Sequence, residues 1–157
     1  MAVELCPENP FYRYRLGAAL LANGMAEEAL PELERARDLE PGNGFYHFWL
    51  GDVYERVGRL SDAVASIRVA ALLDPVDAYY CVRLGLLFLQ IGCPQDAVAC
   101  LRQAVRVAPD NPSYHYLLGD TYVRIGAERQ ALSHYRHARK LGSYDTAFVE
   151  KVRRSAL

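Results

Sequence analysis

Histidine and cysteine are the residues of this sequence whose types and spacing come nearest to metal or nucleophilic chemistry. His134 and His137 are three residues apart, a spacing that places both imidazoles on one face of a helix. Two imidazoles hold a divalent metal firmly only when further ligands lie nearby, and the surrounding sequence offers no third ligand at a suitable spacing. We therefore interpret this pair as part of an ordinary solvated face and predict no metal site.

The four cysteines do not form a recognisable site either. Cys6, Cys81, Cys93 and Cys100 contain no C-x-x-C pair, and no cysteine–histidine spacing matches a zinc site. Free thiols on a helical scaffold indicate a reducing compartment, so we predict a cytoplasmic protein.

Signatures of catalysis are absent from the sequence. It contains no nucleophile–base motif, no glycine-rich phosphate loop and no paired-carboxylate signature. We predict a protein that is not an enzyme and has no cofactor. A net charge of −1 and a pI near 6.4 give no overall attraction to nucleic acid or to acidic membranes. No segment reaches the ~18 apolar residues that span a bilayer. We therefore predict that the protein binds neither nucleic acid nor a membrane.

The elements that must carry any site follow a strict repeat. Leu-Gly pairs recur every 34 residues, and the glycines that follow them keep the same period. Apolar residues with helical spacing precede and follow each of those glycines, which predicts two helices per repeat joined at a glycine turn. Alanines at equivalent positions, such as Ala29 and Ala36, predict close helix contacts where a larger side chain would overpack. The predicted helices cover about 10–23, 27–39, 44–57, 61–73, 78–91, 95–107, 112–125 and 129–141.

This pattern resembles the tetratricopeptide repeat, whose signature W-x2-L-G-x2-Y, A-x3-F and a closing proline recurs at the same period. The second repeat matches it at Leu50, Gly51, Tyr54, Gly58, Ala63, Ile67, Ala70 and Pro75. The resemblance implies an all-α fold, a right-handed superhelical solenoid of helix-turn-helix repeats. It divides the chain into a remnant of a preceding repeat (1–9), four repeats (10–43, 44–77, 78–111 and 112–145) and a C-terminal capping helix (146–157).

The sequence departs from the family pattern at two kinds of position. The tryptophan slot holds Arg13, His47, Cys81 and His115, and we interpret both histidines as packing residues. Pro31 lies about one turn into a second helix, where we expect it to remove a hydrogen bond or bend the helix.

In this family the first helices line a concave surface, so the resemblance implies that the same slots form a groove here. Aromatic and arginine side chains dominate the energies of many interfaces, and several occupy these slots. The alternative is that they are partly buried between helices. A recurring tyrosine column (Tyr12, Tyr46, Tyr80 and Tyr114) is interpreted as packing between repeats. The candidate groove residues are Phe11, Tyr14, Arg15, Phe45, Phe48, Trp49, Asp52, Tyr79, Arg83, Tyr116, Asp120 and Arg124.

Trp49 and Arg83 occupy the same slot one repeat apart, so we expect them side by side at the centre of the groove. The leading hypothesis is a scaffold or adaptor that binds a peptide segment of a partner protein. Two alternatives stay open. One is homotypic assembly through the repeat ends, because residues 1–40 carry a net charge of −4 and residues 124–157 carry +5. The other is the substrate-recruiting arm of a larger enzyme.

Overall fold

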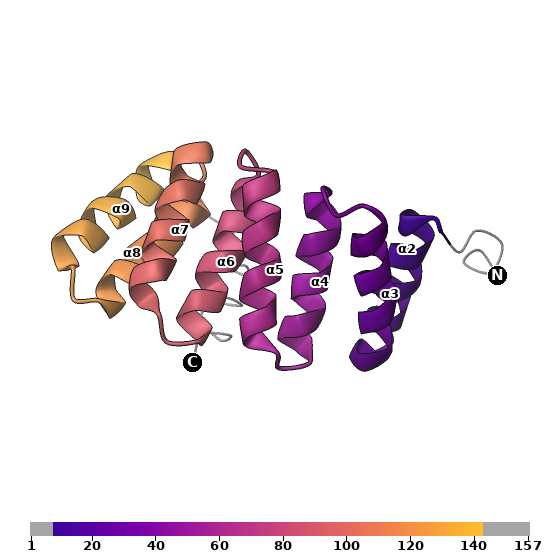
Figure 1. Ribbon diagram of the computed structural model, residues 1–157. Helices are drawn as coiled ribbons and strands as arrows, with labels where there is room; N and C mark the ends of the chain where they lie inside the picture. Colours follow the sequence, from indigo (N-terminus) through magenta and orange to yellow (C-terminus); the bar gives the residue numbers. More distant parts are fainter. Residues whose placement is uncertain (1–7, 143–157) are drawn as a thin grey trace. The chain divides into compact units, whose positions relative to one another are not determined.

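The computed structural model describes residues 8–142, which form eight α-helices and no strand (Figure 1). The predicted capping helix and the remnant before residue 8 lie outside the described residues. None of the helices in the described part is long and apolar enough to cross a membrane. The helices are α2 (Pro10–Ala22), α3 (Ala26–Leu39), α4 (Gly44–Arg56), α5 (Leu60–Leu73), α6 (Ala78–Gln90), α7 (Pro94–Val107), α8 (Pro112–Arg124) and α9 (Glu128–Leu141).

The first helix of every repeat begins at an Asn or Asp cap. The side chain of Asn43, for example, accepts a hydrogen bond from the backbone N–H of Phe45 at 3.1 Å. Such a cap satisfies a helix N–H group that has no partner within the helix. The other three caps are Asn9, Asp77 and Asn111.

Each first helix ends at the predicted glycine turn. The backbone φ angles of Gly24, Gly58, Gly92 and Gly126 lie between +73° and +80°. Glycine adopts this left-handed conformation without the steric cost that a Cβ atom imposes. The second helix starts directly after each turn, so the prediction of four helical hairpins is confirmed for residues 8–142.

The described residues divide into two compact units on either side of the Pro75–Val76 bond. In unit 1, α2 packs on α3, α3 on α4, and α4 on α5 (Figure 1). In unit 2, α6 packs on α7, α7 on α8, and α8 on α9. Each unit therefore contains two helical hairpins and the contact between them.

Small residues allow the two helices of each hairpin to approach closely, as the repeat predicts. A Cβ atom added to Gly17 would lie 2.8 Å from Leu33 Cγ, and one added to Gly119 would lie 2.7 Å from Tyr135 Cε1. Both separations are shorter than ordinary van der Waals contact. Ala29 and its equivalents in the second helices are almost completely buried at the same contacts.

Pro31 does not interrupt its helix. α3 continues from Ala26 to Leu39 with the proline inside it. Proline has no N–H to donate to the carbonyl of Glu27, so the expected loss of one hydrogen bond follows from its chemistry, but the helix does not end there.

Candidate peptide-binding surface

Aromatic rings from α2 and α4 gather on one surface of unit 1. The ring of Tyr14 lies 4.7 Å from that of Phe45, edge to face, and 5.4 Å from that of Trp49. Phe45 and Trp49 are 6.2 Å apart and also meet edge to face. These separations and angles are those at which aromatic pairs attract one another. The ring of Phe11 lies 6.2 Å from that of Tyr14, so four of the predicted groove residues are brought together. We call Phe11, Tyr14, Phe45 and Trp49 the aromatic surface.

The aromatic surface is open to solvent. Phe11 is 49% exposed and Phe45 is 39% exposed, while Tyr14 and Trp49 are half-buried. The guanidinium of Arg15 lies 5.9 Å from the centre of the Phe11 ring, within reach of a cation–π contact. Large apolar rings exposed together, with a cation beside them, are typical of surfaces that bind a partner.

Two predicted groove residues of unit 1 are less accessible than the sequence suggested. Phe48 is only 7% exposed and packs edge-on against Trp49 at 6.0 Å. Asp52 is buried, and its carboxylate accepts a hydrogen bond from Arg56 Nε at 2.9 Å. Positions three apart lie on the same side of an isolated helix, so the packing of the neighbouring helices, and not the helix spacing, leaves Phe45 exposed and Phe48 buried.

The predicted groove residues of unit 2 have varied surroundings. Tyr79 is 39% exposed, and Arg124 is exposed. The hydroxyl of Tyr135 donates to the carboxylate of Asp120 at 2.5 Å. Tyr116 lies with its ring 5.2 Å from that of Tyr135, and Arg83 is half-buried. Trp49 belongs to unit 1 and Arg83 to unit 2, so their side-by-side arrangement stays a prediction.

The two central members of the tyrosine column are buried, and their packing between repeats stays an interpretation. Tyr46 and Tyr80 are buried, and burial raises the pKa of the Tyr46 phenol. Burial, followed by the charge of Asp77, likewise raises the pKa of Tyr114. Tyr12 is the exception, because it is 36% exposed in the first helix of unit 1.

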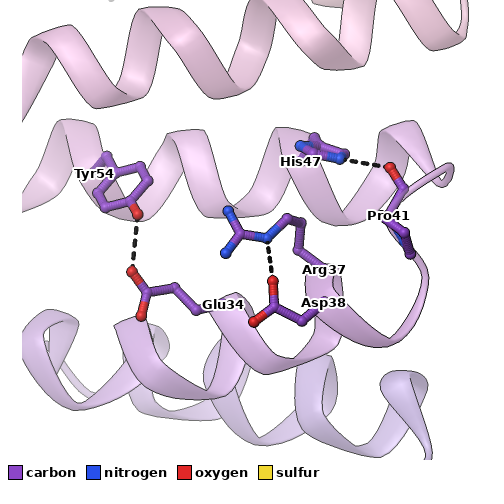
Figure 2. Close-up of polar contacts among 6 residues, drawn as sticks. All are labelled: Glu34, Arg37, Asp38, Pro41, His47 and Tyr54. Carbon is purple, nitrogen blue, oxygen red and sulfur yellow. Dashed lines mark hydrogen bonds and ion pairs between the residues drawn. The ribbon is translucent and has the colours of Figure 1, made fainter.

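The tryptophan slot is structural in both repeats where it holds histidine. His47 Nε2 donates to the carbonyl of Pro41 at 2.8 Å (Figure 2), and His115 Nε2 donates to the carbonyl of Pro109 at 2.9 Å. These bonds connect each first helix to the loop before it. In the first repeat the same slot holds Arg13, which pairs with Glu32 at 2.8 Å.

His134 differs from the expected solvated face. Its Nδ1 lies 3.1 Å from Nδ1 of His115, and its ring stacks on Tyr122 at 5.5 Å. Burial is the main cause that lowers the pKa of His134, and the basic neighbours His115, His137 and Arg102 lower it further. His137 is exposed, although its ring lies 4.3 Å from that of His115. The solvated-face interpretation was therefore wrong for His134, because the helix spacing alone did not reveal the contact from α8.

These imidazoles do not form a metal centre. No group of three or more potential ligands in residues 8–142 could hold a metal ion. Instead, the donation from His115 Nε2 to the Pro109 carbonyl leaves its Nδ1 as an acceptor, so His134 Nδ1–H is the donor between the two rings.

Comparison with known proteins places the chain in a family. One family model, described as tetratricopeptide repeat, matches residues 14–78, and another, described as TPR repeat, matches residues 85–126. No curated protein sequence matches the chain.

Solved structures agree with the family matches. MamA is 18% identical and has a TM-score of 0.82, with 89% of this chain and 82% of that chain covered. A MamA from Desulfovibrio magneticus RS-1, residues 41 to the end, is 22% identical with a TM-score of 0.76 and coverage of 85% and 76%. YrrB, described as a TPR protein with an unusual peptide-binding site, is 20% identical with a TM-score of 0.77 and coverage of 98% and 78%. The fold is thus an all-α solenoid of helical repeats, and the chain belongs to the tetratricopeptide-repeat family.

Proposed function

We propose that this protein is an interaction scaffold that binds a peptide segment of a partner protein on the aromatic surface of unit 1. Its tetratricopeptide repeats support a role in protein–protein interaction, and repeats of this kind typically serve as non-enzymatic scaffolds. The single observation that carries the finer proposal is the group of exposed rings formed by Phe11, Tyr14, Phe45 and Trp49.

The chemistry of this surface favours an apolar or aromatic anchor in the peptide. Rigid rings lose little conformational entropy when they become covered, and they provide a large apolar area. Arg15 adds a permanent positive charge beside Phe11, which suits an acidic group next to that anchor. The peptide-binding site described for YrrB provides a precedent in a protein of the same fold.

A peptide selection followed by titration tests the proposal. Trp49 is the only tryptophan of the chain, so its fluorescence reports directly on this surface. Peptides selected from a random library should quench or shift that emission as they bind. Tyr14→Ala should weaken binding by about tenfold or more, as expected for a central interface residue.

Leu72→Ala is the matched control, because Leu72 is 73% exposed in the same unit but lies on α5, which carries none of the four rings. Selected peptides that bind Tyr14→Ala as tightly as the unmodified protein would exclude the aromatic surface as the binding site.

A further inference from the structure

A groove on the second-helix side of unit 2 combines cationic and aromatic side chains. α7 and α9 provide its walls, and α8 provides its floor. It is a different surface from the aromatic surface of the first helices. The lining residues are Arg102, Val105, Arg106, Leu118, Tyr122 and His134.

Unit 1 has acidic residues at two of the repeat positions that are arginine in the groove of unit 2. Two repeats earlier, Glu34 stands where unit 2 has Arg102, and Asp38 stands where it has Arg106. Tyr54 is the equivalent of Tyr122, and its hydroxyl donates to Glu34 at 2.9 Å (Figure 2). Unit 1 therefore supplies from its own chain a carboxylate that accepts the tyrosine hydrogen bond.

Unit 2 lacks these internal acids. Arg102 and Arg106 are exposed, and neither is in an ion pair with another of residues 8–142. Arg106 donates to the side-chain oxygen of Gln103 at 3.0 Å, which leaves its positive charge uncompensated. The ring of Tyr122 stacks on His134 rather than approaching a carboxylate.

The neighbours whose electrostatic effect on His134 is described are all basic residues. Arg102 on α7, His115 on α8 and His137 on α9 each lower the pKa of His134, after the larger effect of burial. Asp110, in the loop between α7 and α8, acts on His115 instead and favours its protonated form. An anion in the groove would lie beside the permanent charges of Arg102 and Arg106, and it would favour the protonated form of His134.

We propose that the groove of unit 2 binds an acidic peptide segment of a partner protein. The carboxylates of that segment take the places held in unit 1 by Glu34 and Asp38. They pair with Arg102 and Arg106, which present planar donor groups suited to carboxylates, and accept a hydrogen bond from the Tyr122 hydroxyl. Val105, which is half-buried, supplies apolar surface for the aliphatic part of the acidic side chains.

The small number of cations in the groove favours a peptide over a nucleic acid. Duplex DNA carries a negative charge about every 1.7 Å, so proteins that bind it need an extended row of cations. Here only two arginines line the groove, and the chain as a whole has a net charge of −1.

Binding of carboxylates in this groove should be linked to protonation. A carboxylate beside His134 stabilises the imidazolium form, so the pKa of His134 is higher in the complex than in the free protein. The complex then takes up a proton, and affinity increases as the pH falls towards 6. A site with arginines alone would lack this dependence.

Fluorescence anisotropy with a fluorescein-labelled hexaglutamate peptide tests the proposal at low salt, at pH 7.5 and pH 6.0. We expect saturable binding of hexaglutamate that is stronger at pH 6.0, and no binding of hexaglutamine. The double variants R102E/R106E and R102Q/R106Q should both weaken binding by about tenfold or more. Circular dichroism establishes that each variant is folded.

Arg129 and Arg139 provide the matched control, because both are exposed residues of α9 that do not line the groove. The variant R129E/R139E makes the same change in net charge as R102E/R106E and should retain binding. Equal loss of binding in the two charge-reversed variants would show non-specific attraction and overturn the proposal.

Two further measurements decide the identity of the occupant. An oligouridine that displaces hexaglutamate at lower concentration than an unlabelled acidic peptide would overturn the assignment to a peptide. Sedimentation velocity over a range of concentrations should show no self-association that depends on Arg102 and Arg106. Self-association that R102Q/R106Q abolishes would assign the groove to a second copy of the chain instead of a separate partner.

Discussion

Single residues decide the properties of each site in this chain because the backbone pattern is the same in every repeat. Position by position, unit 1 and unit 2 present the same helices, yet Glu34 in one corresponds to Arg102 in the other. Tyr54 donates to an acid of its own unit, whereas Tyr122 stacks on a histidine. The chemistry of a repeat therefore resides in the few positions that the fold leaves unconstrained.

His115, which is buried, and His134, which is half-buried, should make stability depend on pH. Burial lowers the pKa values of His115 and His134 below the ordinary 6.5, so the unfolded chain binds protons more readily than the folded chain. Their contribution to stability is complete above pH 6.5 and is lost as the pH falls below that value. The urea midpoint should therefore be lower at pH 5.5 than at pH 7.5.

His134→Gln removes one of the titrating groups and should reduce the difference between the two midpoints. A pH difference that is identical in this variant would show that His134 does not contribute to it.

Gly85 should tolerate no side chain at its helix contact. A Cβ atom there would lie 3.0 Å from Leu101 Cγ and 3.4 Å from the carbonyl oxygen of Ala97. Gly85→Leu should lower the free energy of unfolding by about 1–3 kcal/mol through overpacking, measured by urea denaturation. Gly42→Ala is the control, because nothing lies within 4 Å of a Cβ atom there and its stability should change little. If Gly85→Leu is as stable as the unmodified protein, a close helix contact is not the reason why glycine follows leucine at this position of the repeat.

At the scale of the element, each helix begins and ends at signals that act locally. The Asn or Asp caps start the first helices, and glycines with positive φ end them. The second helices have no side-chain cap, so they depend more on packing against their neighbours. α3 is further destabilised by Pro31 in its interior.

Replacing Pro31 should stabilise α3. Pro31→Ala restores an N–H that can donate to the carbonyl of Glu27 and removes the clash of the ring with that carbonyl. We expect stability to rise by about 1–3 kcal/mol, seen as a higher melting temperature.

Pro94→Ala is the control for this prediction. Pro94 is the first residue of α7, where no intrahelical partner exists for an N–H group, so its replacement should bring no comparable gain. A gain at Pro94 as large as that at Pro31 would contradict the explanation by a missing hydrogen bond.

At the scale of the whole molecule, stability in a repeat protein is expected to come from each repeat and from contacts with its neighbours. The described residues form two compact units, each with its own pair of hairpins. A local defect should therefore weaken its own unit most.

Hydrogen exchange of Gly85→Leu tests this distribution. Amides of α6–α9 should exchange faster than in the unmodified protein, because the altered contact lies between α6 and α7. Amides of α2 and α3 should change least. A uniform increase over all eight helices would instead indicate that the described residues unfold as one cooperative body.

The sequence by itself determined the family, the alternation of helices and the residues at the turns and close contacts. These features were readable because each is a local requirement that recurs at the same period: a left-handed turn needs Gly24, and a close contact needs Gly17. The Asn and Asp caps recur at that period too and could have been found in the same way.

Only the tertiary structure decided which side chains meet and which stay exposed. Helix spacing placed Phe45 and Phe48 near the same surface, but the packing of α4 exposes the first and buries the second. The contacts of Tyr54 with Glu34 and of His134 with His115 join residues of different helices. Their geometry depends on the distance and rotation between those helices, which the periodicity of one helix does not contain.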